Sequence, residues 1–176
     1  MSEFIADLKK IKARARSNME KGAVTEAYKA DLQAVIKVLN DVLATEIVCV
    51  LRYKRHYFTA AGINSDSVKA EFLQHANEEQ QHADWVATRI TQLNGEPNFN
   101  PEGLASRSHS EYAEGDDLVS MLKEDLFAER IAIESYSEIA RWLGDKDPTT
   151  RKLIEDILKV EEEHAEDLKS LLEKMS

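Results

Sequence analysis

Four long segments with helical periodicity limit the fold of this chain more than any other feature of its sequence. Apolar side chains recur at spacings of three and four, as on one face of an α-helix, over residues 25–61, 66–94, 117–143 and 148–175. A shorter segment at about residues 3–17 predicts an additional N-terminal helix. Only 6 Gly and 3 Pro occur, while 32% of residues are charged, which favours long helices over loop-rich β structure. The chain is therefore predicted to be all-α.

The connections between these segments predict how the helices are arranged. A few residues join the first segment to the second and the third to the fourth, which indicates antiparallel neighbours. Residues 95–115 join the second to the third and can span the roughly 40 Å length of such helices. Two hairpins joined by one long crossover have ferritin-like connectivity. We expect a leader at residues 1–24 and a four-helix bundle at residues 25–176.

Residues typical of helix ends support these boundaries. Gly62, Gly95 and Gly144 follow the first three long segments, and each is expected to adopt the left-handed conformation that often follows a helix. Asp147 is the expected N-cap of the last helix, with Pro148 at its first position, where the missing N–H is tolerated.

One carboxylate interrupts the apolar face of each long segment near its middle. These residues are Glu46, Glu79, Glu129 and Glu161. Glu46 and Glu79 are 33 residues apart and Glu129 and Glu161 are 32 apart, so the two hairpins place them at matching depth. A buried carboxylate costs several kcal/mol without a partner. Four that converge predict a bound cation.

Two histidines complete this pattern. His82 lies three residues after Glu79, and His164 three after Glu161, so each pair shares a helix face. One Glu from each of two helices, with Glu-x-x-His from the other two, is the ligand set of carboxylate-bridged di-iron or di-manganese bundles. For a single such motif, a charged surface run such as residues 161–164 is the alternative interpretation.

The other candidate residues have weaker sequence support. Tyr53 lies seven residues after Glu46 on the same face and is predicted to hydrogen-bond a ligand carboxylate or to supply an electron. An ordinary core tyrosine is the alternative. His56, His75 and His109 lack comparable partners in the sequence and are expected at the surface or rim.

The sequence resembles bacterioferritin and its relatives, including the bacterioferritin-like members of the Dps group. The likeness rests on Glu46 with Tyr53 and on the stretches EQQHAD (79–84), GEPN (95–98), MLKEDL (121–126) before Glu129, and EEEH (161–164). It implies two iron ions per subunit, with manganese or zinc as substitutes. It further implies the ligands Glu46, Glu79, His82, Glu129, Glu161 and His164, with Glu79 and Glu161 as bridges.

Two departures from bacterioferritin change what the resemblance implies. The methionine that ligates haem there is Gln80 here, so haem is not expected. Only 12 residues follow His164, too few for the fifth helix of 24-subunit shells. We therefore expect a homo-oligomeric shell of 12 subunits.

These features together predict a ferroxidase that oxidises Fe(II) with O₂ or H₂O₂, stores ferric mineral in the shell and protects against oxidative stress. A di-iron or di-manganese peroxidase or catalase of the rubrerythrin-like type is one alternative. The other is a metal-free helical scaffold that compacts DNA. The absence of a Cys-x-x-Cys pair argues against a fused rubredoxin module.

Charge and apolar content limit partners and location. The formal charge of −10 argues against a general nucleic-acid binder and suits a container for cations. Six Lys and Arg residues within the first 22 residues keep DNA contact by that segment as an alternative to a solvated helix face. A single cysteine, Cys49, and the lack of a signal peptide or a long apolar run predict a cytoplasmic protein without membrane contact.

Overall fold

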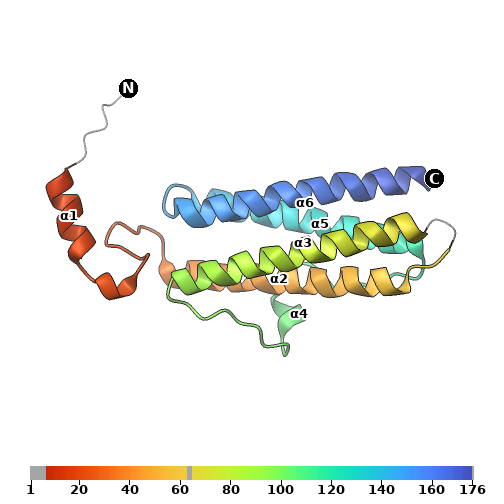
Figure 1. The fold of residues 1–176 in the computed structure, drawn as a ribbon, viewed down its shortest axis with the longest axis horizontal. Coiled ribbons are helices and arrows are strands. Elements are labelled where there is room, and N and C mark those ends of the chain that lie inside the picture. Colours follow the sequence, from red (N-terminus) through yellow and green to blue (C-terminus); the bar gives the residue numbers. More distant parts are fainter. Residues whose placement is uncertain (1–6, 63–64, 176) are drawn as a thin grey trace, which may run out of the picture.

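The computed structural model describes residues 7–62 and 65–175, and within these ranges it contains helices and loops but no strand. Four long helices form the bundle: α2 (Leu32–Thr59), α3 (Ser65–Gln92), α5 (Leu118–Leu143) and α6 (Pro148–Lys174). Three short elements lie outside it: α1 (Leu8–Arg16), the 3₁₀ turn η1 (Met19–Lys21) and α4 (Leu104–Arg107). Figure 1 shows α2 beside α3 and α5 beside α6. The predicted all-α bundle with one long crossover is confirmed.

The crossover between α3 and α5 runs along the outside of α2 and contains α4 (Figure 1). A fully buried ionic group beneath it holds its second half. Asp125 accepts hydrogen bonds from Arg52 Nε and His56 Nδ1, both at 2.8 Å. Arg52 Nη1 also donates to the carbonyl of Glu111, and His56 Nε2 lies 3.1 Å from the carbonyl of Ala113. The crossover is thus fixed to the bundle by paired charges that have no access to water.

Two of the three glycines that were predicted to be left-handed have a positive φ angle. It is 116° at Gly62 and 51° at Gly144, but the ψ of −126° at Gly144 lies outside the left-handed helical region. The prediction for Gly95 is wrong, because Asn94 adopts the positive φ of 60° instead. Gly95 serves close packing: a Cβ there would lie 2.9 Å from a side-chain carbon of Ile36.

The first bundle helix is shorter than the sequence predicted. It begins at Leu32 rather than Thr25, because Asp31 is its N-cap and accepts hydrogen bonds from the backbone N–H groups of Gln33 and Ala34, both at 3.1 Å. The Thr25 hydroxyl accepts only from Ala27 N, in a turn. Residues 22–31 therefore connect the leader to the bundle without a helix.

The connection between the leader and the bundle contacts the bundle through Tyr28. Its hydroxyl donates to Asp147, which caps α6 by accepting from Thr150 N and pairs with Arg89 at 3.0 Å. Helix α1 projects away from the bundle (Figure 1), and its nine residues are all exposed. The expected start of this helix near residue 3 lies outside the described residues. The domain division after residue 24 stays a prediction.

Two apolar clusters fill the bundle, one toward each end. One is built around Leu39, Ile90 and Leu143, and the other around Phe72 and Leu168. The buried glutamates and histidines of the bundle interior lie between these clusters, so closely packed apolar side chains shield them from solvent at both ends. In the described part of the chain, no helix is long and apolar enough to cross a bilayer.

Candidate metal centre

The four predicted glutamates meet in the middle of the bundle, one from each long helix. Glu46 lies on α2, Glu79 on α3, Glu129 on α5 and Glu161 on α6, and each is at most 1% exposed. Each lies on the apolar face of its helix, at a position where the spacing predicts a core residue. The fold therefore concentrates four carboxyl groups in a region that water does not reach.

His82 forms one end of this centre. Its Nδ1 atom lies 3.1 Å from Glu79 Oε2, 3.2 Å from Glu161 Oε1 and 3.3 Å from Glu46 Oε2. These four residues offer ligand atoms that all lie within 4.8 Å of one another. Two atoms bound to one metal ion at about 2.1 Å with a tetrahedral angle are roughly 3.4 Å apart. The observed separations therefore suit a shared ion.

His164 forms the other end in the same manner. Its Nδ1 atom lies 3.3 Å from Glu161 Oε2, 3.4 Å from Glu79 Oε1 and 4.0 Å from Glu129 Oε2. Glu79 and Glu161 thus direct one oxygen toward each histidine, while Glu46 and Glu129 each serve one end. This is the arrangement expected of two bridging and two terminal carboxylates.

Two tyrosines hold the terminal carboxylates from opposite hairpins. The Tyr53 hydroxyl of α2 donates a hydrogen bond to Glu129, and the Tyr136 hydroxyl of α5 donates one to Glu46. Tyr136 was absent from the predicted site. The signal was available, because Tyr136 follows Glu129 by seven residues, just as Tyr53 follows Glu46. Each hairpin therefore supplies the tyrosine that hydrogen-bonds a glutamate of the other hairpin.

Two histidines expected at the surface are fully buried. His56 belongs to the ionic group beneath the crossover, and His75 lies directly against His164, with ring centroids 3.9 Å apart and planes inclined by 20°. His109 is partly exposed. The prediction was wrong for His56 and His75 because their partners come from distant parts of the chain.

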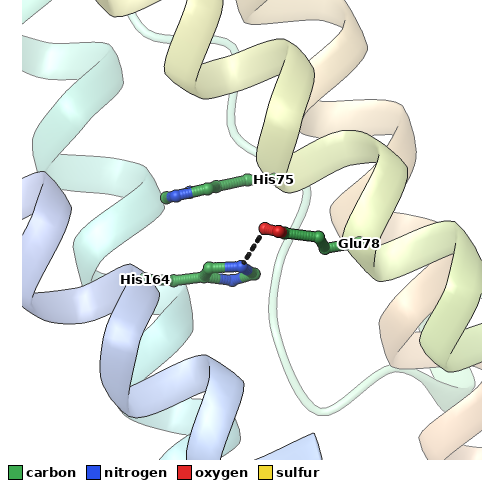
Figure 2. Close-up of side chains that lie close together, drawn as sticks. All are labelled: His75, Glu78 and His164. Carbon is green, nitrogen blue, oxygen red and sulfur yellow. Dashed lines mark hydrogen bonds and ion pairs between the residues drawn. The ribbon is translucent and has the colours of Figure 1, made fainter.

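Glu78 extends the centre outward. Figure 2 shows its carboxylate bonded to a ring nitrogen of His164, with His75 stacked on the face of that ring. The bond joins Glu78 Oε2 to His164 Nε2 at 2.8 Å, which leaves Nδ1 free to face the buried glutamates. A carboxylate on the outer nitrogen fixes the orientation of a metal-ligating imidazole and raises its basicity.

Burial and mutual repulsion divide the four carboxyl groups into two kinds. Burial, and next repulsion from Glu79, raises the pKa of Glu46 to about 8, and the pKa of Glu129 is also raised well above its usual range by the same two causes. Burial also opposes ionisation of Glu79 and Glu161, but attraction to the two histidines, whose Nδ1 atoms lie within 3.4 Å, outweighs it and lowers both of their pKa values.

His82 and His164 respond in the opposite sense. Burial disfavours their charged forms, but attraction to the nearby carboxylates outweighs it, raising the pKa of His164 to about 12 and that of His82 higher still. His75 differs, because burial, followed by repulsion from His164, lowers its pKa to about 3. Without metal, these shifts favour two imidazolium–carboxylate pairs flanked by protonated Glu46 and Glu129.

Several buried polar atoms of the centre have no hydrogen-bond partner. They are Glu79 Oε1, Glu129 Oε2, both carboxylate oxygens of Glu161 and His164 Nδ1. Buried polar atoms are rarely left unpaired, and each costs about 1–3 kcal/mol. All of them point toward the common centre, so divalent cations placed there would satisfy them together. The donor set of carboxylate oxygens and imidazole nitrogens fits iron, manganese or zinc.

The fold and this centre define a class of protein, and comparison with known families identifies it. Residues 36–176 match the family described as ferritin-like domain, and the chain belongs to that family. The match includes α3, α5 and α6, all of α2 except its first four residues, and every residue of the centre. The fold family predicted from connectivity and ligand spacing is therefore confirmed.

Individual relatives cover most of the chain. It is similar to the bacterioferritin of Desulfovibrio desulfuricans, with 28% identity over 131 residues, which are 74% of this chain and 69% of that protein. It is also similar to the DNA protection during starvation protein of Pyrococcus furiosus, with 31% identity over 138 residues, 76% of this chain and 74% of that protein. Both relationships agree with the resemblance seen in the sequence.

A solved structure supports the same relationship. It is a dodecameric thioferritin, the bacterioferritin-related protein of Bacteroides fragilis, with a TM-score of 0.80 and 34% identity. The match covers 84% of this chain and 89% of that one. Residues 1–35 lie outside the family match, and they include the leader, the connection to the bundle and the first four residues of α2.

Proposed function

We propose that this chain oxidises ferrous iron at the buried two-metal centre and stores the ferric product inside a hollow shell of identical subunits. The observation that carries the proposal is the convergence of four buried glutamates and two histidines whose unpaired atoms share one space. Membership of the ferritin-like family and similarity to bacterioferritin support it. By this proposal, Glu79 and Glu161 would each help to hold both iron ions, because each directs one oxygen toward either histidine.

The centre could hold two ferrous ions and exclude bulk water, and both properties favour iron oxidation. Two ferrous ions bound side by side can together supply the two electrons that reduce O₂ to H₂O₂, or H₂O₂ to water. The protein residues position the ions, keep bulk water away and accept or release protons as the ions bind. Tyr53 and Tyr136 hold the terminal carboxylates during these changes of charge. Removal of ferrous iron together with peroxide would limit oxidative damage.

A twelve-subunit shell is the assembly we propose. The similar protein of Bacteroides fragilis is dodecameric, and its structure covers 84% of this chain. Large apolar side chains on the bundle surface are suited to contacts between subunits, among them Phe58, Phe127 and Trp142. Gln80 stands at the position of the haem-binding methionine, is exposed and donates to Asp84, so we propose that the shell binds no haem.

The test combines assembly size with iron oxidation. Purified protein should have the mass of a dodecamer by light scattering, and ferrous iron added in air should be oxidised rapidly and retained as mineral. Glu79→Ala/His82→Ala removes one bridge and one terminal ligand, so oxidation should slow to the rate in buffer. Gln80→Ala/Gln81→Ala is the matched control, because both side chains are exposed on the same helix turn.

The alternatives predict different results. A peroxidase or catalase would retain two metal ions per chain, turn over peroxide many times and accumulate no mineral. A metal-free scaffold would contain equally little iron in the wild type and in Glu79→Ala/His82→Ala. Either result would refute iron storage as the function of the chain.

A further inference from the structure

A second group of metal-ligating side chains lies just outside the two-metal centre. Glu71 and His75 are one helical turn apart on α3, and Asp167 faces them from α6. His75 Nε2 is 3.2 Å from Glu71 Oε1 and 3.9 Å from Asp167 Oδ2. The side chains of Glu71 and Asp167 are 27% and 55% exposed, so this group opens to solvent on one side.

The hydrogen bonds of His75 show which of its nitrogen atoms is free. Its Nδ1 lies 3.2 Å from the Tyr53 hydroxyl, which already donates its proton to Glu129. Nδ1 must therefore donate to the Tyr53 oxygen, and a neutral ring then carries its lone pair on Nε2. This nitrogen is completely buried and has no hydrogen-bond partner, although it points at two carboxylates.

A lone pair aimed at two carboxylates is unfavourable unless a cation lies between them. The nearby charges reinforce this requirement, since Glu71 experiences repulsion from both Asp167 and Glu78, opposed by His164 and Lys174. Two carboxylates, those of Glu71 and Asp167, thus face one electron-donating nitrogen, and Glu78 is close enough to repel Glu71. A divalent ion would compensate all of them at once.

The neighbouring group in Figure 2, His75, Glu78 and His164, is not suited to share one cation. His75 and His164 are close to Glu78, but their rings are stacked with centroids 3.9 Å apart. Metal–nitrogen bonds lie in the plane of an imidazole, so two nearly parallel rings cannot direct lone pairs at one ion. His164 Nε2 is also occupied by its bond to Glu78. The available ligand on His75 therefore points toward Glu71 and Asp167.

We propose that Glu71, His75 and Asp167 bind a third divalent transition-metal ion, separate from the two-metal centre. The 3.2 Å separation of His75 Nε2 and Glu71 Oε1 is close to the roughly 3.4 Å expected between two ligands of one tetrahedral zinc ion. A small rotation of the exposed Asp167 side chain would bring its carboxylate to the same distance. Three protein ligands leave one position for solvent.

The site is connected to the centre but does not require its activity. His75 contacts Tyr53, and Tyr53 contacts Glu129, so a single chain of hydrogen bonds joins the two sites. Its ligands are distinct from the six residues proposed to hold the iron pair. Metal binding here can therefore be tested without measuring iron oxidation.

The experiment counts zinc ions. Metal-free protein is equilibrated with Zn²⁺ at neutral pH, and bound zinc per chain is measured by mass spectrometry of the metal. We expect three ions in the wild type and two in Glu71→Gln/Asp167→Asn, which changes only partly exposed side chains to near-isosteres. Glu134→Gln/Glu138→Gln, exposed on α5, removes the same charge and should keep three. Anomalous diffraction from zinc-loaded crystals should place the third ion beside His75.

The outcomes separate this site from the proposed function. Wild type and Glu71→Gln/Asp167→Asn with equal zinc content would overturn the third site. So would a third ion that diffraction places elsewhere. A wild type that binds one zinc ion, lost only in that variant, would support the third site and refute the two-metal centre. Retention of one ion at His75 in Glu79→Ala/His82→Ala would support the independence of the two sites.

Discussion

Loading the centre with two divalent ions should release about four protons per chain at pH 7. Without metal, the raised pKa values keep Glu46 and Glu129 protonated, while Glu79 and Glu161 are ionised. The two ligand histidines are protonated, so two negative and two positive charges cancel. Two divalent ions need four ionised carboxylates and two neutral imidazoles to reach the same neutrality. The exchange is therefore two protons for each ion.

The pH dependence of this exchange has a definite sign. Each proton displaced makes metal affinity rise about tenfold per pH unit, as long as that proton is still bound in the metal-free protein. Glu46 loses its proton first, with a pKa of about 8. The number released should therefore fall from about four toward three as the pH rises from 7 to 9, and Glu46→Gln should release one fewer at pH 7.

Calorimetry can count these protons directly. Zn²⁺ is titrated into metal-free protein in buffers of different ionisation enthalpy, and the slope of observed heat against that enthalpy gives the number released. Ordinary carboxylates and neutral histidines would release almost none at pH 7. A count below two, or one that increases with pH, would refute the charge assignment of the centre.

Asp125→Asn leaves the buried guanidinium of Arg52 without its charge partner and should cost about 3–5 kcal/mol of stability in urea denaturation, with faster proteolysis of the crossover; unchanged values would contradict it. Tyr136→Phe removes the donor to Glu46 and should weaken zinc binding about 10–100-fold without loss of helix content by circular dichroism; wild-type affinity would show that the bond is unimportant. The melting temperature of metal-free protein should fall between pH 5 and 8. Burial raises the pKa of Glu46 from 4.5 to about 8, so its protonated form stabilises the fold fully below pH 4.5, and this contribution is lost as the pH rises to about 8. A melting temperature that stays constant or rises would exclude that contribution.

The sequence was most informative where a site is encoded within single helices. Glu79 and His82, like Glu161 and His164, are three residues apart, so helix geometry alone places them on one face. Their meeting with glutamates of the other helices followed from the matched register of the hairpins. The structure brings all of these residues together.

The residues that were misplaced depend on partners far away in the chain. His75 is buried through contacts with Tyr53 and His164, and no spacing within α3 reveals them. The start of α2 was misjudged for a related reason. Val24 and Tyr28 continue the spacing of four seen from Leu32 onward and pack against the core, but they do so from a turn-rich connection. A regular spacing of apolar residues indicates which side chains are buried, but buried side chains can also come from a segment that is not helical.

The exchange of partners between hairpins also has a mechanical meaning. Each hairpin supplies one Glu-x-x-His pair and one tyrosine that grips a carboxylate of the opposite hairpin. The bound ions would thus clamp together two halves that are linked covalently only through the crossover. A chain cleaved within residues 98–102 should remain one particle while its ions are in place, and chelation should loosen its halves.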